Sequence, residues 1–397
     1  MEYSKLSKDL TSKISKQEKK DHGIYFTPPS CIIRILDSLN PFINYMTNVL
    51  EPSCGSGEFI TAIQRKFPQL QITGIEMNPT IFESIKNIHV NLLNQDFLKY
   101  KTEQKYDLII GNPPFYVMKK EDVSKEYHPY FDGRPNIFIL FIIHSLELLN
   151  EGGILSFVLP KNFLNCLYYD KTRQYINLNF KILDIIDCKN DTYLETEQDT
   201  IVINIQKTTK SEKNIFVLEN HGFTIFSDKE NHPRLTSLYQ NSKSLWDLGF
   251  KVSVGNVVWN QCKHLLTEDS TKTRLIYSSD IQNNHLGIKT YKNGEKKNFI
   301  NKPGIIKPMI VINRGYGVGE YNFNFCLIDE KKEFLVENHL ICIESKKDLP
   351  RDELILSYKK IIWSLNDERT NEFIQNYFGN NAINTTELNY ILPIYDI

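Results

Sequence analysis

Short apolar runs alternate with amphipathic stretches through the first half of this 397-residue chain. The runs have the length of buried strands, and the stretches between them have the apolar spacing of helices. Strands that alternate with helices form a parallel sheet through right-handed crossovers. The pattern predicts an α/β fold with a Rossmann-like, doubly wound, mostly parallel sheet. We expect strands over residues 48–51, 71–76, 106–110, 154–159, 181–187 and 200–205, and helices over 58–67, 80–87 and 136–149.

This alternation ends after Lys207, where the chain becomes polar. We expect a boundary near residues 208–215, between a first domain over 21–210 and a mixed α+β domain over 211–397. The first 20 residues carry six lysines and three acidic side chains with little apolar periodicity. They are expected to form a basic, solvated N-terminal arm or a frayed helix.

Several classes of protein are disfavoured by the sequence. The longest uninterrupted apolar run, 137–143, is far shorter than the roughly 20 residues of a spanning helix, and the N-terminus lacks the apolar core of a secretory signal. The seven cysteines include no C-x-x-C pair, which favours free thiols in a reducing compartment. We therefore expect a cytoplasmic protein without membrane contact and without a metal site.

A glycine turn follows the strand expected at 48–51. Gly55 and Gly57 precede a helix whose N-terminal N–H groups are free to bind a ligand. Glu76 ends the next strand, where a carboxylate accepts hydrogen bonds from ribose hydroxyls. A dinucleotide fingerprint requires a third glycine, but position 60 is Ile. The motif therefore favours an adenosine ligand other than NAD.

Three further motifs carry chemistry. Gly111-Asn112-Pro113-Pro114-Phe115 directly follows the buried strand YDLII, and its two prolines make the loop rigid. The Asn112 and Pro113 carbonyls can accept both hydrogens of one planar amino group, and Phe115 offers a flat face for a base. In Asp96-Phe97, the carboxylate can accept a hydrogen bond from the exocyclic amine of an adenine. The segment 23–29 (GIYFTPP) is an extended turn that could close over a cofactor tail.

Together these motifs resemble the gamma-type, TaqI-like N6-adenine DNA methyltransferases of restriction–modification systems. That family has the motif order G-x-Y-x-T-P, a glycine loop opening with E-P, an acid, D-F and N-P-P-F/Y, and all five stand here in that order. The similarity covers about residues 22–207. It implies a class I S-adenosylmethionine-dependent catalytic domain over 21–210 and a DNA target-recognition domain over 211–397.

The resemblance assigns a role to each motif residue. The methionine part of the cofactor would be held by Thr27, Pro28, Glu51, Cys54, Gly55 and Gly57. Glu76 would bind the ribose and Met77 would pack on the cofactor adenine. Asp96 would take the adenine amine, with Phe97 beside the ring.

The same resemblance implies a catalytic loop of Asn112, Pro113, Pro114 and Phe115, with Tyr193 stacking on the other face of the target base. Two accepted hydrogen bonds would localise the lone pair of the adenine amine for attack on the cofactor methyl group. Because a base inside a duplex cannot reach such a loop, the nucleotide must flip out. Tyr168 and Tyr169 are the alternatives to Tyr193.

Basic residues are distributed unevenly in the second half. Residues 251–314 contain 11 basic and four acidic side chains, whereas 321–397 contain eight basic and 13 acidic ones. The basic segment is interleaved with aromatic residues, which suits contact with phosphates and bases. The candidate DNA-binding residues are Lys289, Lys292, Lys296, Lys297, Arg314 and Tyr316.

Three alternative functions are also compatible with the sequence. An RNA adenine methyltransferase or a protein glutamine methyltransferase would use a similar loop, because their target nitrogens are also planar. A catalytically silent DNA-binding module is the non-enzyme alternative. For the DNA enzyme, we expect a nucleoid-associated monomer that acts on double-stranded DNA beside a separately encoded cognate restriction endonuclease.

Overall fold

The computed structural model describes residues 2–196, 198–208, 214–287, 289, 291, 295–314, 323–378 and 383–395. The chain divides into two compact units, Met1–His232 and Pro233–Ile397. Among the described residues, every helix is too short or too polar to cross a bilayer.

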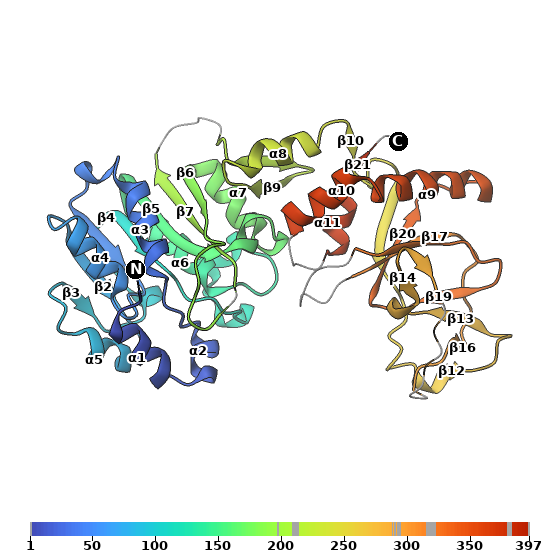
Figure 1. Ribbon diagram of the computed structural model, residues 1–397, viewed down its shortest axis with the longest axis horizontal. Coiled ribbons are helices and arrows are strands. Elements are labelled where there is room, and N and C mark those ends of the chain that lie inside the picture. The colour runs from blue at the N-terminus through green and yellow to red at the C-terminus, as the bar shows by residue number, and fades with distance from the viewer. Residues whose placement is uncertain are drawn as a thin grey trace. The chain divides into compact units, whose positions relative to one another are not determined.

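The first unit is built on one seven-stranded sheet, shown in Figure 1, with the strand order β3-β2-β1-β4-β5-β7-β6. The strands are β1 (Asn48–Glu51), β2 (Gln71–Ile75), β3 (Asn91–Leu93), β4 (Tyr106–Gly111), β5 (Leu149–Pro160), β6 (Phe180–Asp187) and β7 (Thr200–Lys207). The first five run parallel, and β7 pairs antiparallel with both β5 and β6. The predicted α/β, mostly parallel sheet is confirmed. Only β3 was missed, because a strand of three residues, Asn91–Leu93, is too short to show a strand pattern in the sequence.

Two hydrophobic cores cover the two faces of this sheet. Alternate residues of each strand point to opposite faces, so Leu50 and Ile109 join one core while Val49 and Leu108 join the other. Helices α6 (Ile137–Leu148) and α7 (Asp170–Asn179) pack in the first core, and α3 (Pro29–Leu39) and α4 (Glu58–Lys66) in the second. Helix α5 (Pro79–Ile85) follows β2. The fold is therefore doubly wound.

The first 20 residues are ordered helices, which differs from the expected arm. Helix α1 (Lys5–Lys13) buries Leu10 against Ile81 of α5, together with Ile14 just beyond its end. In α2 (Lys16–His22), the buried Lys19 ammonium forms an ion pair with Glu195. The apolar residues here recur every four positions, which is a helix period. Lysines dominate the composition of this segment, so the short apolar stripe did not lead to the prediction of ordered helices.

The first unit also extends past the boundary expected near 208–215. A hairpin of β8 (Val217–Asn220) and β9 (Phe223–Phe226) follows β7, and Phe216 and Phe226 are buried in the core of α6 and α7. This burial holds the hairpin to the seven-stranded sheet. The division between units therefore falls at His232, within α8 (Asn231–Leu238).

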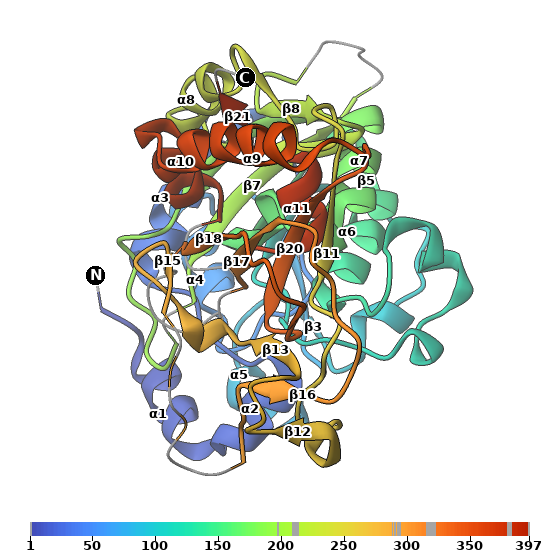
Figure 2. The same ribbon diagram turned by 90° about the vertical axis from the view of Figure 1, so that its right-hand side faces the viewer.

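The second unit is a mixed α+β structure. Four strands, β11 (Phe250–Val254), β20 (Leu340–Ser345), β17 (Met309–Asn313) and β18 (Phe325–Ile328), form an antiparallel sheet visible in Figure 2. A second sheet contains β12 (Leu266–Thr267), β16 (Phe299–Ile300), β13 (Thr273–Ile276) and β19 (Phe334–Val336). Short ladders pair β14 (Ile281–Gln282) with β15 (His285–Leu286) and β10 (Ser242–Lys243) with β21 (Ile394–Tyr395). The helices are α9 (Arg351–Leu365), α10 (Glu368–Phe373) and α11 (Thr385–Tyr390).

Arg173 of α7 is fully buried and holds together three parts of the first unit. Its Nε donates to the Thr224 carbonyl in β9, and its Nη1 donates to the carbonyls of Phe163 and Cys166 at 2.9 and 2.8 Å. Asp170 balances its charge from one turn earlier on the helix. The guanidinium therefore fixes the segment after β5 to both α7 and the β8–β9 hairpin.

We predict that Arg173→Met destabilises the first unit. The substitution leaves several buried carbonyls without a donor, which costs about 3–5 kcal/mol, or roughly 6–20 °C in melting temperature for a unit of this size. Differential scanning calorimetry of the full chain measures the shift. Lys171→Met on the same helix removes only an exposed ion pair with Asp132 and should leave the melting temperature nearly unchanged. Equal melting temperatures for both variants would contradict the role given to Arg173.

Candidate active site

A cavity of about 390 Å³ opens where β1, β2 and β4 end. Ligands of open α/β sheets bind at the carboxyl ends of the strands, and this volume lies in the usual range for small-molecule sites. The walls come from four segments that are distant in sequence. They include residues 22–27, 51–56, 76–79 and 95–98, together with Asn112, Pro114 and Tyr116.

The glycine loop between β1 and α4 forms one wall. Gly57 has φ +74°, and a Cβ on it would lie 2.5 Å from the side chain of Ile88, so neither the turn nor the packing admits a larger residue. The backbone N–H of Gly55 donates to Glu76 Oε2 at 2.9 Å, and that of Asn78 donates to Oε1 at 2.7 Å. The Glu76 carboxylate is therefore held in place by the backbone on both sides.

Glu51 and Glu76 are buried carboxyl groups on the same cavity. Burial raises the pKa of the Glu51 carboxyl well above its ordinary value, and the neighbouring charge of Glu76 raises it further. Burial also raises the pKa of Glu76, against the opposing effect of its two backbone hydrogen bonds. Glu51 Oε2 has no hydrogen-bond partner among the described residues. This buried acceptor is available to a cationic or hydrogen-bonding ligand.

The opposite wall carries Asp96 and Phe97, as expected from the sequence. Asp96 is half-buried and accepts from the backbone N–H of Leu98 at 3.0 Å, so its carboxylate is fixed at the cavity. Phe97 is buried with its ring 5.0 Å from that of Phe141. Met77 lines the cavity with a half-exposed side chain, which suits an apolar contact with a flat ring.

Asn112 stands at the end of β4 with its amide group oriented by another segment. Its side-chain Nδ2 donates to the Tyr25 carbonyl at 3.0 Å, and its backbone carbonyl accepts from Ser53 Oγ at 3.1 Å. The Oδ1 atom is buried and has no partner among the described residues. The side chain is thus locked with an unused acceptor at the cavity.

The rest of this loop packs tightly against the end of α2. A Cβ on Gly23, which caps α2 at φ +63°, would lie 2.5 Å from the Phe115 nitrogen. Pro114 lines the cavity, whereas Pro113 is buried beside it and Phe115 turns edge-on to Phe138 with ring centroids 5.8 Å apart. The structure therefore brings Asn112 and Pro114 to the cavity and places Phe115 at its border.

Several predicted residues lie off the cavity wall. Tyr193 is buried, with its hydroxyl 3.3 Å from Thr200 Oγ1, and it lines a separate small pocket with Tyr25 and Phe26. Pro28 is buried at the start of α3. Among the alternatives to Tyr193, Tyr168 is exposed and Tyr169 has its ring 5.0 Å from that of Phe138. Thr27, Cys54 and Gly55 do line the cavity.

Other wall residues were not singled out from the sequence. They include Ser53, Asn78 and Tyr116, whereas Tyr25 and Phe26 belong to the segment 23–29 that was expected to close over a cofactor tail. Each stands next to a motif residue in the chain, so proximity to the motifs is the signal that would have found them. Their residue types alone carry no chemical pattern.

The candidate DNA-binding residues belong to the second unit. Lys289 and Arg314 are exposed, and Lys297 is half-buried. Lys296 lies over three aromatic rings, with its Nζ 5.0 Å from the ring centre of Trp259, 4.8 Å from that of Tyr277 and 5.7 Å from that of Tyr291. Lys292 and Tyr316 lie outside the described residues.

Comparison with known proteins identifies relatives of this chain. Residues 61–194 match the family model of the Eco57I restriction-modification methylases. The type II methyltransferase M.CvrRI of Paramecium bursaria Chlorella virus XZ-6E is 28% identical over 375 residues, which cover 92% of both chains. The modification methylase CviBIII of Paramecium bursaria Chlorella virus NC1A is 28% identical over 413 aligned residues, which cover 99% of both.

A solved structure also shares the fold along most of the chain. The DrdV–DNA complex aligns with a TM-score of 0.51 and 12% identity, covering 95% of this chain and 57% of the other. At this identity the match bears on the fold alone. It extends through both units of the present chain.

We predict that Glu51→Gln raises the melting temperature near neutral pH. A carboxyl whose folded pKa is raised above about 4.5 binds protons more readily in the folded state than in the unfolded state. Its ionised form therefore lowers stability as pH rises from about 4.5 through the raised pKa, and the amide removes that penalty. Calorimetry at about pH 8 and about pH 4 should show a gain that shrinks at the lower pH. Glu83→Gln on α5, an exposed site, serves as the control.

Proposed function

We propose that this chain, which is similar to the DNA methyltransferases of restriction–modification systems, methylates N6 of adenine within a specific duplex sequence. The methyl donor is S-adenosylmethionine, and the product protects DNA from a cognate endonuclease. The proposal rests on the chemistry of one side chain, Asn112, and on the cavity beside it.

Asn112 supports the choice of an exocyclic amine as the target. Its Nδ2 is engaged by the Tyr25 carbonyl, so the amide cannot turn over without losing that bond. The unpartnered Oδ1 is therefore presented as a fixed acceptor for an N–H donor. With the Pro113 carbonyl accepting the second hydrogen, the adenine nitrogen becomes pyramidal and its lone pair is localised. Preorganised dipoles of this kind lower the barrier without a strong base.

The side chains that line the cavity match the functional groups of the proposed cofactor. The buried, unpartnered Glu51 Oε2 suits the ammonium group of the methionine part, and Glu76, held by Gly55 and Asn78, suits the ribose hydroxyls. Asp96, Phe97 and Met77 suit the adenine amine and ring. When bound, S-adenosylmethionine supplies an electrophilic methyl group on a positively charged sulfur.

The target base must leave the duplex to reach Asn112. Phe115 lies at the border of the cavity and offers one face for stacking, worth about 1–3 kcal/mol. Tyr193 is buried with its hydroxyl near Thr200, so we assign it to packing. The second stacking face is sought in Tyr168 or Tyr169, which follow β5; Tyr168 is exposed, and the Tyr169 ring packs against that of Phe138.

The experiment that tests this function identifies the methylated nucleoside. Purified protein is incubated with labelled S-adenosylmethionine and duplex DNA, single-stranded RNA or protein, and the products are separated by mass spectrometry. The expected product is N6-methyl-2′-deoxyadenosine, in duplex DNA only. Methylation-aware sequencing of DNA from expressing cells then gives the recognition sequence. Methylcytosine in the DNA, or label in RNA or protein alone, would refute the proposal.

We predict that Asn112→Ala abolishes transfer while cofactor binding persists. Removing one preorganised hydrogen-bond partner at a reacting centre costs about 10²–10³ in turnover. Calorimetric titration with S-adenosylmethionine should give nearly the parent affinity, because Asn112 contacts the target amine. Asn87→Ala, an exposed change in the same unit, is the control. An equal loss of cofactor affinity in Asn112→Ala would argue against this assignment.

The second unit is proposed to read the DNA sequence through its basic segment. Lys289 and Arg314 are exposed in the 251–314 stretch, whereas Lys296 is committed to Trp259 and its neighbours. The first two are therefore the better candidates for phosphate or base contacts.

We predict that Lys289→Ala and Arg314→Ala each weaken DNA binding and flatten its salt dependence. Each lost phosphate contact lowers the slope of log affinity against log salt by about one. Fluorescence anisotropy with a labelled duplex at several salt concentrations measures the slope. Lys359→Ala on α9, which is exposed in the acidic 321–397 stretch, should leave it unchanged. If all three variants show the parent slope, the basic segment does not contact phosphate.

A further inference from the structure

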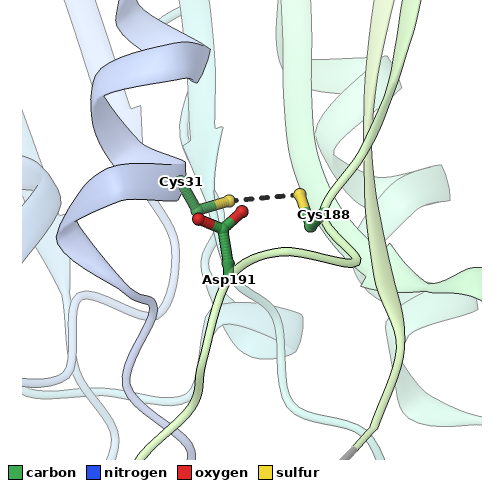
Figure 3. Close-up of side chains that lie close together, drawn as sticks. All are labelled: Cys31, Cys188 and Asp191. Atoms are coloured by element: carbon green, nitrogen blue, oxygen red, sulfur yellow. Dashed lines mark hydrogen bonds between the residues drawn. The ribbon is translucent and has the colours of Figure 1, made fainter.

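Two cysteines and an aspartate meet in the first unit, away from the cavity. Cys31 lies on α3, and Cys188 and Asp191 lie in the connection from β6 to β7. Figure 3 shows the two thiols and the carboxylate pointing toward one another, with the sulfur atoms 3.3 Å apart. The ligand atoms of all three residues lie within 4.8 Å of one another. None of the three residues lines the active-site cavity.

We propose that Cys31, Cys188 and Asp191 form a structural binding site for a thiolate-preferring divalent cation of the zinc class. The donor set, two sulfurs and one carboxylate oxygen, is one that zinc accepts in proteins. The site was not expected from the sequence, because these cysteines are 157 residues apart and form no C-x-x-C pair.

The spacing of the sulfurs fits a metal better than a disulfide. Two thiolates on one tetrahedral zinc ion, each at about 2.3 Å, lie about 3.8 Å apart. The observed 3.3 Å therefore requires an opening of about half an ångström. A disulfide would require the sulfurs to close to about 2.05 Å, which is the larger movement.

Arg34 contributes a positive charge beside the proposed metal site. Its guanidinium forms an ion pair with Asp191 and also donates to the Asp187 carbonyl at 3.0 Å. Hydrogen-bonded partners of this kind orient a ligating carboxylate. Two thiolates and one carboxylate carry three negative charges, which a divalent cation and Arg34 together balance. The two thiols release their protons to solvent as the metal binds.

The fourth coordination position lies toward Ser30. The Ser30 hydroxyl donates to Asp191 Oδ1 at 2.5 Å, and this residue is exposed. A water molecule or the hydroxyl itself can therefore complete a four-coordinate site. A bound ion would join the start of α3, just after Thr27, to the segment that leads through Tyr193 to β7. It would brace the cofactor side of the unit without taking part in the reaction.

Metal titration of the full-length protein tests the proposal. The protein is stripped with chelator under reducing conditions and titrated with Co²⁺, followed by Zn²⁺ competition and elemental analysis. We expect one equivalent per chain and an absorption band for thiolate-to-cobalt charge transfer. Cys31→Ser and Cys188→Ser should each lose at least tenfold in affinity and most of that band. Cys262→Ser, which changes a half-buried thiol in the second unit, should match the parent.

A further variant keeps the test decisive if the serine variants fail to fold. Asp191→Asn retains both thiols, and we expect it to keep the charge-transfer band while binding the metal more weakly. Addition of Zn²⁺ should also raise the melting temperature of the parent and of Cys262→Ser. A parent protein with no charge-transfer band, or one whose Cys31 and Cys188 are found joined as a disulfide without bound metal, would overturn the proposal.

Discussion

The hydrogen bond from Asn112 Nδ2 to the Tyr25 carbonyl ties the proposed catalytic loop to the segment that precedes α3. It fixes which end of the Asn112 amide faces the cavity, since the donor is used and the acceptor is left free. The bond is possible only because Gly23 allows α2 to end within contact of Pro114 and Phe115. The two N-terminal helices therefore help to position the candidate site.

The buried carboxyl groups of the cavity lower the stability of the first unit. Glu51 is buried with an unsatisfied oxygen, and burial raises the pKa of both its carboxyl and that of Glu76. Such groups are unfavourable in a folded protein unless a ligand completes their hydrogen bonds. The rest of the unit offsets this cost with two continuous cores and with buried anchors such as Arg173. A ligand that satisfies Glu51 would recover part of the lost stability.

The comparisons confirm the resemblance drawn from five short motifs. The motifs were sufficient because four of the five follow the end of a strand, where the sheet brings successive strand ends to one edge. Segment lengths and turn residues are local properties, so the strands and most helices of residues 30–207 were predictable. Strand β3, which has only three residues, and α1 and α2, with a short apolar stripe among lysines, were not.

The sequence alone determined the fold class, the order of the motifs and the identity of the residues around Asn112, Glu51, Glu76 and Asp96. Tertiary structure decided which of these reach the cavity and what each side chain contacts. Tyr193 has the right offset from β7 but is buried beside Thr200, and Lys296 is basic but packs over aromatic rings. Cys31, Cys188 and Asp191 carry no sequence pattern at all. These outcomes depend on contacts between side chains that are not neighbours in the chain, up to 157 residues apart for Cys31 and Cys188, and only the packed fold brings them together.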